Sequence, residues 1–274
     1  MSARAPAVFV SHGSPTEALE RDSYTDALAA LGKRFTPRAV AVVSAHWTTQ
    51  RGLAVTAAAH HRLIYDFGGF PSELYRLEYP APGDPALAQA TVGRLAAAGF
   101  AAALEPVRGL DHGAWIPLRI AWPRADVPVV QVSLPELPPE ELFRAGRALR
   151  PLRDDGVLVL GSGGLVHNLM LLQWNDHDAP GQAWAVEFDA WIADHLARGD
   201  VESVLDYRDR APHAVRAAPT TEHIDPMFVA LGAAHEGERA VPIFEGFHYG
   251  SLGMRSFELR EAAQTPEQEK RKKP

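Results

Sequence analysis

The sequence of 274 residues contains no cysteine. Disulfide bonds, thiolate metal sites, iron–sulfur clusters and cysteine nucleophiles are therefore excluded. Any metal ion must be held by imidazole or oxygen ligands. Positive charge is also scarce, with 27 Lys and Arg against 34 Asp and Glu and a formal net charge of −7. This balance argues against a general nucleic-acid binder, which needs a basic face.

Long apolar runs are missing as well. No segment approaches the roughly 18 consecutive apolar residues that can span a membrane. The first ten residues lack the basic stretch and the long apolar core of a signal peptide. We therefore expect a cytoplasmic protein with neither a membrane nor a nucleic-acid partner.

Apolar, β-rich segments alternate with helical segments along the chain. Strands are expected at 7–10, 39–44, 53–58, 127–133 and 157–160, with a closing pair at 241–247 and 252–258. Helices are expected at 22–35, 84–98, 138–150, 181–197 and 226–234. The pattern predicts an α/β fold: a single domain with a central, mostly parallel or mixed sheet flanked by helices on both faces. We expect the domain to span residues 1–259, followed by a charged, disordered tail at 260–274.

Two neighbouring features of the first half refine this prediction. The segment 53–58 is expected to pair beside the strand at 39–44. The segment 61–82 reads as a long loop rich in aromatic residues, glycine and proline. Irregular segments of this length in a compact domain usually have a function or are disordered, and the aromatic content favours a function.

The informative feature is where the histidines fall. Three apolar segments are each followed within a few residues by a histidine, namely His12, His46 and His167. In α/β sheets, ligands collect at the carboxyl ends of the strands, so these imidazoles are expected to converge. Imidazole suits Fe, Zn, Cu or Ni, and the pattern therefore predicts a metal centre.

Two further histidines fit the same pattern. His112 precedes a helical segment, and His223 stands just before the last predicted helix. The nearby carboxylates are expected to orient histidines or to be surface charges rather than to bind the ion; they are Glu17, Asp111, Glu222 and Asp225. The remaining histidines are expected to be structural or surface residues: His60, His61, His177, His195, His213, His235 and His248.

Six motifs in fixed order give the chain a resemblance to a known family. They are residues 11–15 (SHGSP), 44–47 (SAHW), 66–71 (DFGGFP), 79–83 (YPAPG), 110–115 (LDHGAW) and 163–168 (GGLVHN). The chain resembles the class III extradiol ring-cleavage dioxygenases, in particular the single-chain 4,5-DOPA dioxygenase-like branch. The resemblance implies a metal-dependent enzyme that opens the ring of a catechol-type substrate with O₂.

The resemblance also implies a role for each motif residue. His12, His46 and His223 match metal ligands. His167 matches a histidine that binds metal in some zinc-loaded members and otherwise acts beside the metal as a catalytic residue. His112 matches the candidate catalytic acid–base residue. Trp47, Phe67 and Phe70 are candidates for the wall of the substrate pocket, whereas core packing is at least as good an interpretation for Trp115.

The expected cofactor is Fe(2+) for activity, with Zn(2+) bound in the purified protein. An all-histidine site keeps the full dipositive charge of the ion, which should favour a doubly deprotonated catechol but also make zinc a strong competitor. The expected partners are a small-molecule catechol and O₂, and the chain is expected to be a monomer or homodimer. Three arginines could meet a substrate carboxylate: Arg62, Arg108 and Arg210.

Two other interpretations stay open at this point. The same histidines could hold Zn²⁺ and activate water in a zinc-dependent hydrolase. The scaffold could also be a non-catalytic metal-binding or partner-binding homologue. Neither the bond that is cleaved nor the particular catechol follows from the sequence.

Overall fold

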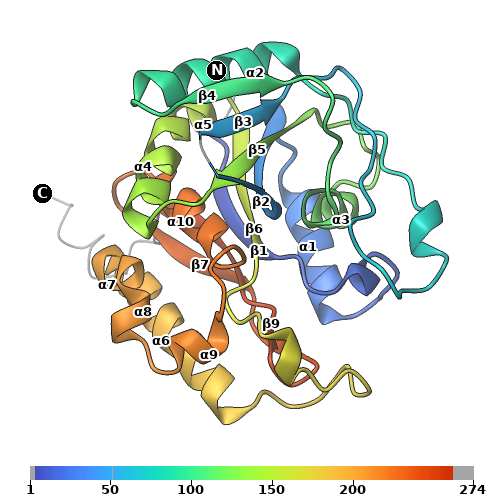
Figure 1. Cartoon of the computed structure of the whole chain (residues 1–274), viewed down its shortest axis with the longest axis vertical. Helices are drawn as coiled ribbons and strands as arrows, with labels where there is room; N and C mark the ends of the chain where they lie inside the picture. Colours follow the sequence, from blue (N-terminus) through green and yellow to red (C-terminus); the bar gives the residue numbers. More distant parts are fainter. Residues whose placement is uncertain (1–3, 51, 262–274) are drawn as a thin grey trace, which may run out of the picture.

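The computed structural model describes residues 4–50 and 52–261 and centres on an eight-stranded mixed sheet (Figure 1). The strand order is β4-β3-β5-β2-β6-β1-β10-β7, and β8 pairs with β9 in a separate small sheet. The strands are β1 Ala7–Ser11, β2 Ala39–Thr49, β3 Leu53–Thr56, β4 Ala102–Glu105, β5 Val129–Pro135, β6 Val157–Gly163, β7 Glu238–Phe244, β8 Phe247–His248, β9 Leu252–Gly253 and β10 Ser256–Glu261.

The middle of the sheet is parallel. β6 lies between β1 and β2 and runs parallel to both, and β2 is also parallel to β5. Antiparallel pairs occur where β10 joins β1 and β7 and where β3 meets β5. The predicted mixed α/β sheet is thus confirmed. In the register, Ser162 of β6 lies opposite both Val10 of β1 and Ser44 of β2, so β1 and β6 end level with each other and beside the Ser44 region of β2.

Helices cover both faces of the sheet, as predicted (Figure 1). They are α1 Ser23–Arg34, α2 Pro85–Ala97, α3 His112–Ala121, α4 Pro139–Leu149, α5 Pro151–Asp154, α6 Ala183–Arg198, α7 Val201–Leu205, α8 Tyr207–Arg210, α9 Ala214–Ala217 and α10 Asp225–Gly232. Short 3₁₀ turns are η1 Pro15–Ala18, η2 Leu74–Arg76 and η3 Leu169–Leu171.

Two cores form because side chains of a strand alternate between the faces of a sheet. In β1, Ala7 and Phe9 face the core under α4, α6 and α10, whereas Val8 and Val10 face the core under α1 and α3. The same alternation runs along the buried residues of β2 and β6. Burying one Val, Leu or Phe side chain is worth about 1.5 to 3 kcal/mol, so this double layer fixes the central strands firmly.

Aspartates begin the helices that flank the sheet. Asp22 accepts a hydrogen bond from the Thr25 backbone in a capping box of α1, and Asp84 accepts one from the Leu87 backbone at the start of α2. Both caps satisfy backbone N–H groups that a helix leaves unpaired. Asp111 does the same for Ala114, so that α3 begins at His112.

Two expectations about strands are wrong, and the expected closing pair is confirmed with shifted bounds. β2 does not end at 44 but continues through Thr49, with a shift in its register against β5 between Val43 and Thr48. β3 does not pair beside β2, because β5 lies between them. The closing pair is formed by β7 and β10, while residues near 247 and 252 form the small β8–β9 sheet.

Two expectations concern the ends of the domain and the membrane. The boundary predicted at 259/260 stays a prediction; β10 runs through Glu261, and residues 262–274 lie outside the described part of the chain. Within residues 4–50 and 52–261, no helix combines the length and apolar character required to cross a membrane.

Candidate active site

Five histidines gather at the carboxyl ends of the central strands. His12 follows β1 directly, and His46 lies within the irregular last part of β2. His167 follows β6 by four residues, His112 is the first residue of α3, and His223 stands two residues before α10. Sequence reasoning therefore predicted the convergence correctly, although it placed His46 beyond the end of its strand.

His223 is held against β6 by contact between backbones. The Gly164 backbone N–H donates to the His223 carbonyl over 2.7 Å. A Cβ atom added to Gly163 would lie 2.0 Å from that same carbonyl oxygen, so only glycine allows the approach. The missing Cβ of glycine lets the two backbones come this close beside the site.

The rings of His12, His46 and His223 are spaced as if around one point. Their ring centroids are 4.8 Å apart for His12 and His46, 5.0 Å for His46 and His223, and 5.3 Å for His12 and His223. Imidazoles that share one ion at about 2.1 Å have centroids about 4.5 to 5.2 Å apart for angles between 90° and 109°. The three rings therefore have the spacing of a common coordination sphere.

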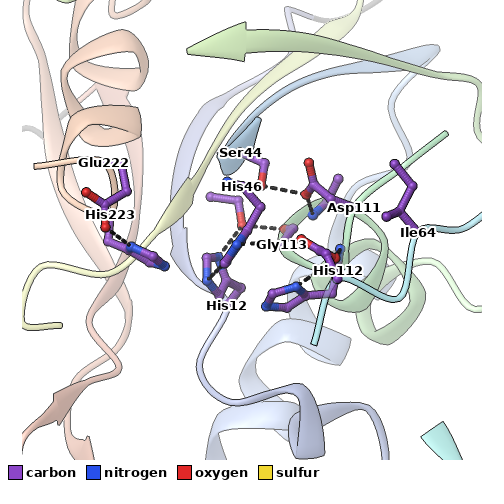
Figure 2. Close-up of polar contacts among 12 residues, drawn as sticks. His12, Ser44, His46, Ile64, Asp111, His112, Gly113, Glu222 and His223 are labelled. Atoms are coloured by element: carbon purple, nitrogen blue, oxygen red, sulfur yellow. Dashed lines mark hydrogen bonds and ion pairs between the residues drawn. The ribbon is translucent and has the colours of Figure 1, made fainter. Parts of the chain in front are cut away.

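The nitrogen atoms of two of these rings face each other. The Nε2 atoms of His12 and His46 are 3.0 Å apart. Two ligand nitrogens on one ion lie about 3.0 to 3.4 Å apart in octahedral or tetrahedral geometry. The Nε2 atom of His223 is buried and has no hydrogen-bond partner. Figure 2 shows the His223 ring directed toward the His12–His46 pair.

Hydrogen bonds to neighbouring groups fix which ring nitrogen carries the proton in His12 and in His223. Ser162 donates its hydroxyl hydrogen to the Gly113 carbonyl, so its oxygen accepts from Nδ1 of His12 over 3.2 Å. Nδ1 of His223 donates to Glu222 over 3.1 Å. In a neutral imidazole the other nitrogen then carries the lone pair. Both Nε2 atoms are thereby prepared to bind a cation, in the way outer carboxylates and hydroxyls orient metal ligands.

Burial keeps these imidazoles neutral. It is the main cause that lowers the pKa of His12 well below its usual value, with His46 and His223 adding repulsion. Burial likewise lowers the pKa of His46 to about 2 and lowers that of His223. The hydrogen bond from His223 lowers the pKa of Glu222 to about 2, so this carboxylate stays charged. A cation bound between the rings would replace the protons that the site disfavours.

His112 lies on the side of the His12–His46 pair away from His223 (Figure 2). Its Nδ1 and its backbone N–H both donate to Asp66 over 3.0 Å. Burial raises the pKa of Asp66, but the hydrogen bond and the charge of His112 outweigh it and lower the pKa. The His112 ring lies 4.0 Å from that of His46. The arrangement leaves Nε2 of an oriented imidazole free beside the candidate metal position.

His167 is brought to the site but not in the position of a separate ligand. Its ring stacks on that of His223 at 3.4 Å and 8°. Two rings bound to one ion through Nε2 would have centroids about 4.5 Å apart or more, so stacked rings compete for the same position. Burial, above all, lowers the pKa of His167 to about 3.

The distances between ligand atoms give a different grouping from the ring centroids, because they place His223 apart from His12 and His46. Among the described residues, three groups bring one ligand atom from each member within 4.8 Å of one another: His12 with His46 and His112; His167 with Glu222 and His223; and Glu17 with His177 and His248. The first group makes His112 an alternative third ligand to His223. Ring spacing favours His223, because the 5.0 Å between His46 and His223 matches ligands on one ion better than the 4.0 Å between His46 and His112 does.

The carboxylates expected to orient histidines do so in different ways. Glu222 does so directly. Asp111 acts through Ser44, which donates to Asp111 over 2.7 Å and accepts from the His46 backbone over 3.2 Å. Asp225 contacts Thr221 instead, and Glu17 contacts His248. Those last two therefore orient none of the five clustered histidines.

Aromatic side chains surround His112 and His46. Phe67 meets His112 edge to face at 5.5 Å, and Phe70 packs on Phe67 at 5.7 Å. Trp47 is buried beneath the Arg108 guanidinium, 4.8 Å from its ring centroid. Trp115 is fully buried and bonded to the Ile64 carbonyl, which makes it a core residue.

Of the three arginines considered, Arg108 lies nearest the site. Its guanidinium donates to the His46 carbonyl over 3.2 Å and lies 3.4 Å from Asp111, and its Nε has no hydrogen-bond partner. Arg62 and Arg210 have exposed side chains. A cleft of about 520 Å³ opens beside Glu222 and is lined by Thr48, Leu134, Pro135, Glu136, Leu137, Thr221, Glu222 and Asp225.

Sequence reasoning missed two residues that shape the site. The sequence pointed to Asp66 only as the first residue of the DFGGFP motif, although Asp66 orients His112. Its position in that motif was the available signal. No sequence pattern singled out Ser162, which orients His12. Its place opposite Ser44 in the register could not be foreseen without the strand order.

Comparisons with known proteins agree with this site. Residues 3–254 match the family described as the catalytic LigB subunit of aromatic ring-opening dioxygenase. The 4,5-DOPA dioxygenase extradiol of Portulaca grandiflora is 40% identical over 260 residues, covering 92% of this chain and 94% of the relative. That of Escherichia coli K12 is 41% identical over 264 residues, covering 94% and 96%. The crystal structure of an uncharacterized protein from E. coli K12 matches with a TM-score of 0.80 and 36% identity, covering 94% of this chain and 100% of that one.

Proposed function

Because the chain belongs to the LigB family and is a metal-dependent extradiol ring-cleavage dioxygenase, we propose that it opens DOPA-like catechols on an Fe(2+) ion held by His12, His46 and His223. In such a reaction a ring carbon–carbon bond beside the two hydroxyls breaks, and both atoms of O₂ enter the product. The observation that carries the proposal is the spacing of the three rings, with two Nε2 atoms 3.0 Å apart.

The donor set fits a divalent transition metal. Three neutral imidazoles offer borderline nitrogen ligands, which suit Fe(2+) and also Zn(2+). The buried, unpartnered Nε2 of His223 supports this fit, since an orphaned buried polar atom costs about 1 to 3 kcal/mol unless a partner is supplied. Zinc binds such sites more tightly than iron, so protein purified without added iron should carry mainly zinc and show little activity.

Fe(2+) supplies the redox activity that lets O₂ react with the aromatic ring, and zinc does not. The residues of the chain contribute binding, orientation and proton transfer. His112 takes a hydroxyl proton from the catechol at Nε2, since its Nδ1 is engaged with Asp66. The same imidazolium returns the proton to oxygen as the ring opens. Groups placed in this way contribute about 10² to 10⁴ in rate.

His167 is proposed to act beside the metal rather than on it. Stacking on His223 at 3.4 Å keeps that ligand ring in its plane. Because burial lowers the pKa of His167 to about 3, the ring stays neutral and adds no charge next to the ion. His167→Ala should weaken metal binding less than His223→Ala.

The substrate is proposed to lie against Phe67 and Trp47, with Phe70 supporting Phe67. The relatives whose names specify DOPA act on a catechol that carries an amino-acid group. In this chain, Arg108 is the arginine placed to meet a carboxylate, because it lies over Trp47 and keeps an unpartnered Nε. Arg108→Lys should raise KM for DOPA more than for unsubstituted catechol.

The direct test is a catechol panel on anaerobically iron-loaded protein. O₂ uptake and the yellow colour of a ring-opened semialdehyde are expected with DOPA, and neither with zinc-loaded protein. His112→Ala should keep its metal and lose turnover, whereas His12→Ala should lose both. Iron loading without O₂ uptake for any catechol would refute the proposal, and substrate turnover without O₂ would favour the zinc hydrolase interpretation.

A further inference from the structure

A second group of metal-ligand side chains lies apart from the five clustered histidines. Glu17 of η1, His177 of the loop before α6 and His248 of β8 bring three ligand atoms within 4.8 Å of one another. Asp22 adds a second carboxylate, 3.4 Å from His248. We propose that this group binds a divalent transition-metal ion of the Zn²⁺ type, separate from the metal of the active site.

Three of these side chains hold ligand atoms that nothing else satisfies. Oε2 of Glu17, Oδ2 of Asp22 and Nε2 of His177 are all buried and have no hydrogen-bond partner. Glu17 itself is 0% exposed. A carboxylate buried with one oxygen unpaired is stabilised by a cation beside it.

The tautomers of both histidines agree with a metal. Nδ1 of His177 is engaged with the Asp178 carboxylate at 2.8 Å, which leaves the lone pair on the unpartnered Nε2. A carboxylate behind a histidine in this way is the usual outer partner of a metal ligand. Nδ1 of His248 lies 3.0 Å from Oε1 of Glu17, the separation of two ligand atoms that share one ion, and its Nε2–H then donates toward Asp22 at 3.4 Å.

Protonation of His248 alone accounts for fewer of these contacts than a bound metal ion does. If His248 were an imidazolium, it would bridge Glu17 and Asp22, but the Glu17 Oε2 and His177 Nε2 atoms would stay without partners. The two rings lie 4.1 Å apart, closer than two ligand rings on one bound ion, so we expect them to separate slightly when the ion binds. One divalent ion bound by Glu17, His177 and His248 supplies a partner for the orphaned Glu17 and His177 atoms, while Asp22 accepts from Nε2 of His248.

The ligand types select the class of ion. Two imidazoles and one or two carboxylates suit zinc and its neighbours, whereas calcium needs six to eight oxygen ligands. The His177 side chain is 27% exposed, so an ion can enter through the loop before α6. The three ligands come from segments far apart in sequence, and the ion would join η1, this loop and the β8 strand.

The second ion would also brace the active site. A Cβ atom on Gly13, which follows His12, would lie 2.8 Å from Cγ of Glu17, so Glu17 packs directly against the turn after β1. Anchoring Glu17 therefore limits movement of the turn that presents His12. Loss of the second ion should loosen this turn without removing any residue of the active site.

Zinc titration of the metal-free full-length protein tests the proposal independently of catalysis. Calorimetry and elemental analysis after desalting should find two Zn²⁺ per chain in the wild type. His177→Ala and the volume-conserving Glu17→Gln should each bind one, or bind the second at least tenfold more weakly. The exposed His60→Ala is the matched control and should bind two.

A variant of the active site shows which of the two sites holds each ion. His12→Ala should keep one Zn²⁺, and His12→Ala combined with His177→Ala should bind none. Co²⁺ used as a probe should give visible absorption in His12→Ala that the double variant lacks. The proposal is overturned if the wild type binds a single Zn²⁺, or if His177→Ala and Glu17→Gln bind zinc as His60→Ala does.

Discussion

Replacing Asp66 with asparagine separates proton transfer from metal binding. Asp66 accepts hydrogen bonds from Nδ1 and from the backbone N–H of His112, both at 3.0 Å. It lies 3.6 Å from Nδ1 of His46 and contacts neither His12 nor His223 through a hydrogen bond. Asparagine has nearly the same volume, so α3 should stay in place while the charge behind His112 disappears.

The size of the effect follows from the bond that is changed. A hydrogen bond to a charged group contributes about 1.5 to 3 kcal/mol, and a neutral one about 0.5 to 1.5 kcal/mol. The hydrogen bond from the His112 imidazole is therefore weaker by about 1 to 1.5 kcal/mol in the variant. This difference corresponds to a five- to twelvefold lower kcat. If the asparagine amide donates to Nδ1 instead, His112 adopts the wrong tautomer and the loss approaches the 10² to 10⁴ of a missing acid–base group.

The assay is steady-state O₂ uptake with iron-loaded protein, together with iron content by elemental analysis. Asp66→Asn should keep the iron content of the wild type and lower kcat at least fivefold with little change in KM. Glu73→Gln, an exposed carboxylate of the same loop, is a suitable control and should match the wild type. An Asp66→Asn protein with unchanged kcat, or with its iron lost, would show that Asp66 does not act through His112.

Other predictions concern the metal, the backbone and pH. His223→Ala should lose bound metal and activity together, measured by elemental analysis and O₂ uptake. Gly163→Ala should do nearly the same, because its Cβ would lie 2.0 Å from the His223 carbonyl, whereas at Gly164 the nearest atom is 3.8 Å away and alanine should be tolerated. Burial lowers the pKa of His61 below 6.5 in the folded state. As the pH falls, His61 therefore takes up a proton in the unfolded state before it does so in the folded state, and the stability of the fold decreases as the pH drops through 6.5. His61→Gln should flatten that fall in urea unfolding between pH 7.5 and 5, and an equally steep fall in the variant would contradict this assignment.

The convergence of the histidines could be predicted because it depends on local patterns. Apolar runs identify β1, β2 and β6, and parallel strands present their carboxyl ends at one edge. His12, His46 and His167 follow from this alone, and His112 and His223 from their positions before helices. The extension of β2 past His46 was missed because its last residues alternate less clearly and its register shifts against β5.

Contacts between distant segments could not be predicted. The insertion of β5 between β2 and β3 depends on tertiary pairing, which no local pattern encodes. Asp66 and His112 are 46 residues apart, and Glu17 and His248 are 231 apart. His177 and His248 were expected to be ordinary surface or structural histidines, because each stands alone in sequence and only the fold brings it to Glu17.

The place of β1 in the sheet has a consequence for synthesis of the protein. β1 lies between β6 and β10, which among the described strands are the sixth and the last to leave the ribosome. Most of the chain must therefore be synthesised before His223 can reach His12. A nascent chain can present His12 and His46 without their third partner, and the supply of free zinc or iron at the moment of completion should influence which ion is trapped.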